Sequence, residues 1–180
     1  FYADVTLGYK NFLFLHGSGR NDNISILEDG YRSYFYPGVD LSFVVSDAIP
    51  ALHDASFLDY AKIRGGIVKV SQPNLGNAVG PGVYEPAGAY ATRPTFGLGS
   101  GFPFGALTSY TASDRLVQRG LRPETTVSTE AGLELSFFKR RVAGAFTYYT
   151  QQSDNQTIFS ATAPSVGYTS YLLNAGTIKN

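Results

Sequence analysis

The sequence predicts an all-β fold, an antiparallel up-and-down meander of about seven strands that forms part of a large transmembrane β-barrel. Apolar and polar residues alternate with a period of two over long stretches, and the period of an α-helix is nearly absent. The connections between these stretches alternate between short and long. The longest strictly apolar run, 12–15, is far below the roughly 20 residues that a membrane helix needs. These observations favour a chain that crosses a membrane with strands rather than with helices.

The clearest alternating segment places Leu133, Leu135 and Phe137 on one face and Glu130 and Glu134 on the other. A similar pattern resumes after a short basic turn at 139–141, which indicates a β-hairpin. The same criterion applied along the chain predicts strands at about 1–9, 11–22, 33–46, 59–72, 123–138, 141–158 and 168–179.

The connections differ in length in a regular way. Those near residues 10 and 140 are tight, whereas the chain between 73 and 121 is a long loop rich in glycine and proline. Within it, Asp114 followed by residues 115–120 predicts a one-turn helix that Asp114 caps. Short turns at one end and long loops at the other are typical of outer-membrane barrels, in which the long loops are extracellular. A soluble β-sandwich would give similar alternation, so the alternation by itself leaves both architectures open.

Composition excludes several classes of protein. The 180 residues include 14 Lys and Arg and 14 Asp and Glu, so the formal net charge is zero. This balance argues against a nucleic-acid partner and against a polybasic membrane anchor. An aromatic content of 14% with only 16% charged residues is not that of a disordered chain. Cysteine is absent, which excludes disulfides and thiolate metal sites.

Several segments, taken in order, resemble the barrel of SusC/RagA-type TonB-dependent outer-membrane transporters. The strongest match is Leu121–Thr126 followed by Glu130–Phe138, Arg141 and Thr147–Tyr149. Four further pieces occur in the same order as in that family. They are Gly19–Asp22, Tyr36–Phe43, Ala61–Gly65 and Gly167–Asn180.

The resemblance implies a part of a transporter that imports glycan fragments or peptides across the outer membrane of a Gram-negative bacterium. It also implies a SusD-like surface lipoprotein as a lid and TonB as the energy source, acting through a plug region with no counterpart in this sequence. The chain opens and stops in strand-like sequence, so we expect a piece of a longer chain. Its edges would then pair with the rest of the barrel, because open sheet edges do not persist in lipid. A soluble secreted carbohydrate-binding β-sandwich is the alternative.

Charged residues on the polar faces of the strands form the first group of candidate site residues. In a large barrel they would line the lumen or contact the plug, and they would pair across strands. On the lipid face a Lys or Arg at mid-depth would cost about 2–4 kcal/mol. The candidates are Asp4, Asp40, Lys62, Arg64, Glu130 and Glu134.

Aromatic residues and one arginine of the long loop form the second group. Sugars stack on aromatic rings, and protein interfaces bury aromatic and arginine side chains. We expect ligand or lid contacts from Tyr84, Tyr90, Arg93, Phe96, Phe102, Phe104 and Tyr110.

Other motifs do not support chemistry. The sequence contains no nucleophile elbow (G-x-S-x-G) to supply a serine to His16 or His53. We therefore expect no catalytic residue and no enzyme activity. The acidic group Asp22, Glu28 and Asp29 matches no calcium loop, and the alternate glycines at 97–101 are not a dinucleotide motif. No metal site and no cofactor are therefore expected.

Overall fold

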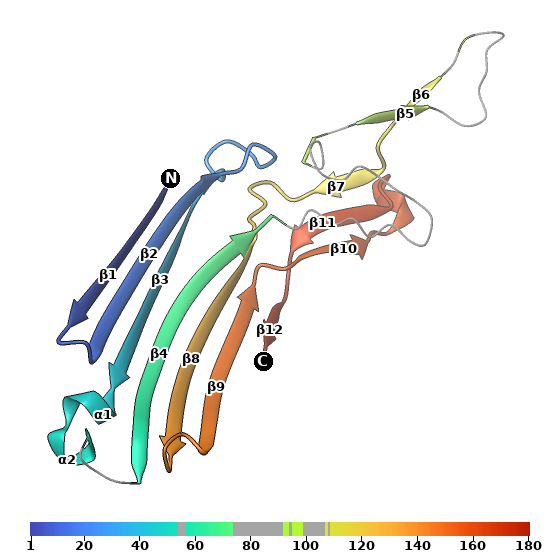
Figure 1. Cartoon of the computed structure of the whole chain (residues 1–180). Coiled ribbons are helices and arrows are strands. Elements are labelled where there is room, and N and C mark those ends of the chain that lie inside the picture. Colours follow the sequence, from blue (N-terminus) through green and yellow to red (C-terminus); the bar gives the residue numbers. More distant parts are fainter. Residues whose placement is uncertain (54–56, 74–91, 94, 99–106, 108) are drawn as a thin grey trace.

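The computed structural model describes residues 1–53, 57–73, 92–93, 95–98, 107 and 109–180. Its largest element is a seven-stranded antiparallel sheet with the order β1-β2-β3-β4-β8-β9-β12. Each of the first six strands pairs with its neighbour in this series, and the sheet curves as a whole (Figure 1). The predicted meander of about seven antiparallel strands is confirmed.

The long strands of this sheet lie close to their expected positions. Their bounds are Tyr2–Tyr9 for β1, Leu13–Asn23 for β2, Ser33–Val44 for β3, Leu58–Gln72 for β4, Glu124–Phe137 for β8 and Val142–Asp154 for β9. Two short helices follow β3, α1 at Val45–Ala48 and α2 at Pro50–His53, and α1 begins at Val45, whereas the strand was predicted to continue to 46. None of the helices among the described residues has the length and apolar character needed to cross a bilayer.

Two predicted strands are interrupted. The strand expected at 141–158 breaks at Asn155, which has a left-handed φ of 59°, before β10 at Thr157–Ala161. The strand expected at 168–179 breaks at Gly176, with φ of 99°, into β11 at Ser170–Asn174 and β12 at Thr177–Lys179. Left-handed residues cannot continue a strand. β9 and β12 therefore join the main sheet, while β10 and β11 belong to a second, smaller sheet.

The one-turn helix predicted after Asp114 is wrong. The chain forms β7 at Arg115–Val117, which pairs with β11 in parallel. Asp114 does not act as a helix cap, because its carboxylate accepts a hydrogen bond of 2.6 Å from the hydroxyl of Thr169. Pairing with a strand distant in sequence thus overrides the local helix signal.

Before β7, a hairpin of β5 (Phe96–Leu98) and β6 (Tyr110–Ala112) projects from the same end of the molecule as β7 (Figure 1). A three-residue 3-10 helix at Pro164–Val166 joins β10 to β11.

The apolar side chains of the main sheet point outward rather than into a core. Phe146 is 67% exposed, Ile63 is 51% exposed and Leu133 is 37% exposed. Leu133 lies directly opposite Phe146 in the β8–β9 register, and Ile63 lies opposite Leu133 in the β4–β8 register. A β-sandwich would seal these residues between two sheets. The exposure of the apolar face therefore contradicts the sandwich and fits a wall whose solvent on that side is lipid.

A small buried cluster packs together the connections at the end of the sheet opposite the β1–β2 and β8–β9 turns. Leu27, Leu121 and Leu172 are 0–1% exposed and come from the β2–β3 connection, the chain before β8 and β11. The side chain of Asn174 bonds both backbone groups of Arg122 at 2.7 Å and the carbonyl of Asn155 at 2.9 Å. The connections at this end are thus packed into one unit.

Candidate functional site

The six charged residues predicted to share a face do so. Alternation within each strand and the register between strands place them on the side opposite Leu133 and Phe146. Lys62 lies opposite Glu134, and Gly66 lies opposite both Asp40 and Glu130 on its neighbouring strands. We call this side of the sheet the polar face. Two clusters of charged side chains lie on it.

The first cluster is a histidine bridge across three strands. His16 on β2 contacts Asp4 on β1 through Nε2 at 2.6 Å and Asp40 on β3 through Nδ1 at 2.5 Å. Tyr2 donates a further hydrogen bond of 2.9 Å to Asp4. Two ionised carboxylates on the two ring nitrogens require both nitrogens to carry a proton. The ring lies between the two carboxylates, so the three groups cannot converge on one metal ion.

The second cluster centres on Arg64 of β4. Its guanidinium pairs with Glu130, lies 3.5 Å from Glu134 through Nε and donates a 3.0 Å hydrogen bond to the hydroxyl of Thr147. Gly132 provides the room for this side chain, because a Cβ at that position would lie 2.8 Å from the Arg64 Nε. Arg64, Glu130 and Glu134 are each about two-fifths exposed, with side-chain exposures of 39%, 42% and 37%. This cluster joins β4, β8 and β9.

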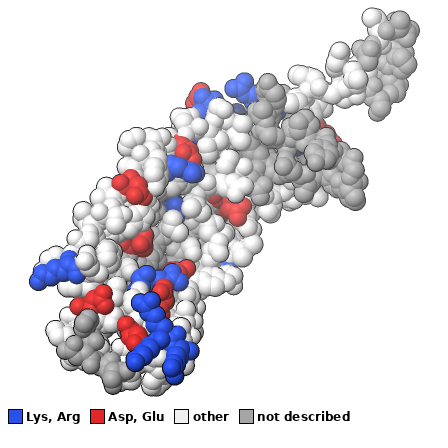
Figure 2. Space-filling model, viewed as in Figure 1, with Lys and Arg blue, Asp and Glu red and all other residues white. Residues whose placement is uncertain are grey.

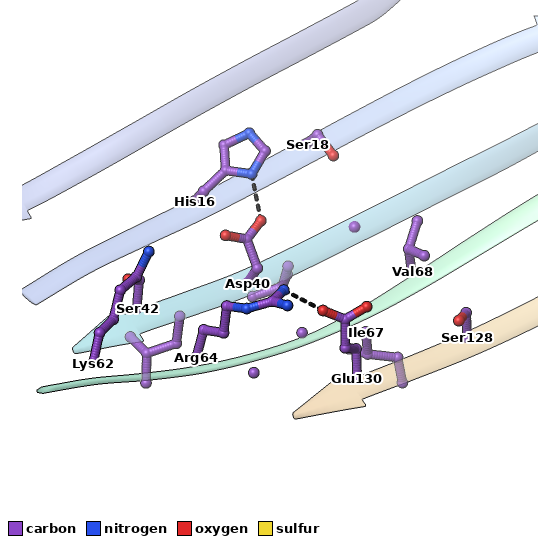
Figure 3. A pocket seen from close by; sticks show the side chains of 15 residues that line it. His16, Ser18, Asp40, Ser42, Lys62, Arg64, Ile67, Val68, Ser128 and Glu130 are labelled. Carbon is purple, nitrogen blue, oxygen red and sulfur yellow. Dashed lines mark hydrogen bonds and ion pairs between the residues drawn. The ribbon is translucent and has the colours of Figure 1, made fainter. Parts of the chain in front are cut away.

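A groove of about 460 Å³ lies between the two clusters on the polar face. Figure 3 shows the bonded pairs His16–Asp40 and Arg64–Glu130 on its sides, with Lys62 beside Ser42. Gly66 helps to keep the groove open, because a Cβ there would lie 2.9 Å from the Cβ of Asp40. Within the part of the chain that the structure describes, Lys62 makes no ion pair. The groove therefore offers hydroxyl groups and one unpaired ammonium group to a polar occupant.

Sequence reasoning considered His16 as a catalytic candidate and missed its central position. The available signal was the tight turn after Tyr9, which fixes the β1–β2 register. That register pairs Thr6 with His16 and Ser18 with Asp4, so Asp4 is a diagonal neighbour of His16. The link to Asp40 depends on the register across the long β2–β3 connection, which the sequence did not supply. His53, the other candidate, lies at the end of α2.

The aromatic residues of the long loop are brought together only in part. Phe96 and Tyr110 are 71% and 69% exposed on the β5–β6 hairpin, and they share one face because Leu98 pairs with Tyr110. Arg93 is also exposed. The remaining predicted contacts lie outside the described residues. They are Tyr84, Tyr90, Phe102 and Phe104.

The acidic group near the β2–β3 connection has protein partners. Asp22 pairs with Arg20 at 2.8 Å, and Asp29 pairs with Arg32 at 2.5 Å. Glu28 accepts a hydrogen bond of 3.0 Å from the backbone N–H of Gly120. Glu28 and Asp29 thus hold the connection, while Asp22 is paired within β2. Within the ranges that the structure describes, no group of three or more histidine or acidic side chains is placed to hold a metal ion.

Comparisons with known proteins agree with this arrangement. No family model matches the sequence. The chain is 27% identical to the TonB-dependent receptor P26 of Formosa agariphila in a 193-residue alignment that covers 100% of the chain and 17% of that protein. The structure matches the RagAB peptide transporter with a TM-score of 0.78 and 15% identity, over 99% of this chain and 18% of that chain. It also matches the siderophore receptor PirA from Pseudomonas aeruginosa with a TM-score of 0.56 and 16% identity, over 99% of this chain and 28% of that chain.

The fold and its two-faced sheet are those of a segment of an outer-membrane β-barrel, the class found in the outer membrane of Gram-negative bacteria. The comparisons confirm the resemblance to SusC/RagA-type TonB-dependent transporters that the sequence indicated. The chain spans less than a fifth of the curated relative, since it covers 17% of that protein's length.

Removing the Arg64 guanidinium should destabilise the sheet, because Glu130 and Glu134 would then repel each other without a cation between them. For half-exposed charges we expect the Arg64→Met change to lower the free energy of unfolding by about 1–2 kcal/mol. Urea unfolding of the longer protein expected to contain this chain, called the parent protein below, measures this loss. Lys62→Met removes a cation from the same face without breaking an ion pair, so its effect should be smaller. Equal losses of unfolding free energy for Arg64→Met and Lys62→Met would contradict the cluster. So would a loss from Arg64→Met that stays the same when Glu130 and Glu134 have both been changed to glutamine.

Proposed function

We propose that the chain forms seven strands of the wall of a TonB-dependent outer-membrane transporter. The apolar face contacts lipid, and the polar face lines the lumen or contacts the plug. Asp4, Asp40, Lys62, Arg64, Glu130 and Glu134 are then lumen-facing. The observation that carries the proposal is the division between the faces. Large apolar side chains are exposed on one side, and paired charges lie on the other.

The orientation follows from the lengths of the connections. In barrels of this class the short turns are periplasmic and the long loops are extracellular. The turns that join β1 to β2 and β8 to β9 are short, and both lie at the same end of the sheet (Figure 1). We therefore assign 73–121 to an extracellular loop and the hairpin turns to the periplasmic side.

The transported substrates that we propose are glycan fragments or peptides. The RagAB structure is described as a peptide transporter, and its resemblance to this chain supports an importer of the same kind. A SusD-like surface lipoprotein would cover the extracellular end, and TonB would act through a plug region of the parent chain. Arg93, Phe96 and Tyr110 would contact the ligand or the lid, together with Tyr84, Tyr90, Phe102 and Phe104.

A role without enzyme activity fits the polar face. The similar proteins are named as receptors and transporters. Both ring nitrogens of His16 are held by carboxylates, so neither is free to accept a proton from a nucleophile. We therefore assign the histidine bridge to the structure of the wall.

Spin labels at two adjacent positions test which face is in lipid. Leu41 is 47% exposed and lies on the apolar face, whereas Ser42 lies opposite Arg64 on the polar face. The chain has no cysteine, so Leu41→Cys and Ser42→Cys place single labels within it. In the parent protein, reconstituted in vesicles, the label at 41 should collide with oxygen far more than with a water-soluble nickel chelate. The label at 42 should show a lower ratio, and equal ratios would exclude a lipid-facing wall.

Uptake measurements test transport separately. Cells that express the parent protein should take up labelled peptides or oligosaccharides only when TonB is present. Uptake that persists without TonB, or no uptake of either substrate class, would contradict the transport proposal while leaving the wall assignment standing.

A further inference from the structure

A compact basic turn joins β8 to β9 at the end of the sheet opposite the buried leucine cluster. Lys139, Arg140 and Arg141 are consecutive and exposed. Across the described parts of the chain, none of these three side chains forms an ion pair. In Figure 2 several Lys and Arg side chains, with Asp and Glu side chains among them, lie at the end of the molecule where Figure 1 places this turn. The turn thus carries three adjacent positive charges, with the carboxylate of Asp59 beside its backbone.

The backbone of the turn is fixed in an unusual conformation. Phe138, Lys139 and Arg140 have φ values of 56°, 57° and 60°, a left-handed region that residues other than glycine rarely adopt. Two hydrogen bonds to the chain at the start of β4 hold it. The N–H of Phe138 donates to the carbonyl of Phe57 at 3.1 Å, and the N–H of Arg140 donates to Asp59 at 2.9 Å. Because the backbone is anchored, the three cationic side chains project from a defined place.

The turn is continuous with the apolar face of the sheet. Val142 and Phe146, the first and third apolar-face positions of β9, are 55% and 67% exposed. The rings of Phe57 and Phe138 beside the turn are 54% and 58% exposed. Aromatic rings are typical of the level where the apolar band of a barrel meets the lipid headgroups. In the orientation of the proposed function, the three cations would lie at the height of the headgroups, next to lipid.

We propose that Lys139, Arg140 and Arg141 bind the phosphate of an anionic phospholipid in the inner leaflet of the outer membrane. This inference rests on the orientation in the proposed function. Guanidinium groups match phosphate oxygens in pairs, and the lysine adds a point charge. An acidic protein segment would also match the charge. The exposed phenylalanines and the adjoining apolar face favour lipid, because acyl chains cover apolar side chains while the phosphate meets the cations.

Lipid retention tests the proposal. The parent protein is reconstituted in vesicles of equal amounts of phosphatidylcholine and phosphatidylglycerol and then extracted in mild detergent, and the retained lipids are quantified by mass spectrometry. The wild type should retain phosphatidylglycerol enriched about fivefold over the bulk ratio. Arg140→Gln/Arg141→Gln should lose most of this enrichment, whereas Arg140→Lys/Arg141→Lys should keep part of it.

A matched variant and a competitor decide among the outcomes. Arg119→Gln/Arg122→Gln removes two exposed arginines from the chain just before β8, and it should leave the enrichment unchanged. No enrichment in the wild type, or equal enrichment in all variants, overturns the proposal. Loss of enrichment in excess inorganic phosphate would identify a site for free phosphate and would overturn it as well. If the glutamine variant fails to fold, the wild-type ratio alone decides. Intact TonB-dependent uptake together with no enrichment would reject the lipid site and leave the transport proposal standing.

Discussion

Replacing Phe146 with arginine is expected to prevent stable insertion of the parent protein into the outer membrane. Phe146 lies opposite Leu133 near the middle of the apolar face and is 67% exposed. A guanidinium at mid-depth on the lipid face of a barrel costs about 2–4 kcal/mol. That is a large fraction of the roughly 5–15 kcal/mol by which folded proteins are stable. The fraction of folded protein in isolated outer membranes, measured by resistance to protease, should fall sharply.

The neighbouring residue on the other face supplies the control. Ala145 lies opposite Glu134 in the β8–β9 register, so Ala145→Arg places the same charge on the polar face beside a carboxylate. Its insertion should match that of the wild type, since polar-face charges remain in water or in ion pairs. Equal losses for the two substitutions would mean that both faces meet the same solvent, which would refute the lipid-facing assignment.

Shortening Leu172 to alanine is expected to release the packed connections without unfolding the wall. Leu172 is 0% exposed and packs with Leu27 and Leu121. Truncating a buried leucine to alanine costs about 2–5 kcal/mol, including the cavity it leaves. Because the cluster joins the β2–β3 connection to β11 and to the chain before β8, the loss should appear there first. Hydrogen exchange of the parent protein should show faster exchange near 118–123 and 170–174, with the exchange of β8 unchanged.

A control on the adjacent strand separates packing from strand pairing. Ile158 on β10 pairs with Leu173 of β11 but is 42% exposed. Ile158→Ala should therefore cost less than about 1 kcal/mol and leave exchange near 118–123 as in the wild type. If Leu172→Ala accelerates exchange throughout β8 and β9, the cluster supports the wall itself, and the separation between wall and loops would be wrong.

Local alternation was enough to predict most of the main sheet. The residues that follow 124 and 142 alternate clearly, and the structure has β8 and β9 there. Interruptions were not predicted, because the segments on either side of Asn155 and of Gly176 both look like strand. The strand β7 was mistaken for a helical turn. Its pairing partner, β11, lies more than fifty residues away, and the capping residue Asp114 binds Thr169 instead.

The sequence by itself determined which side chains share a face, because the side-chain direction in a strand reverses at every residue and needs no knowledge of neighbours. It thereby placed Asp4, Asp40, Arg64 and Glu130 on one side of the sheet. Only the tertiary structure decided which of them meet: His16 between two aspartates, and Arg64 between two glutamates. Such contacts depend on the register between strands, and register across long connections is set by packing that no local pattern encodes.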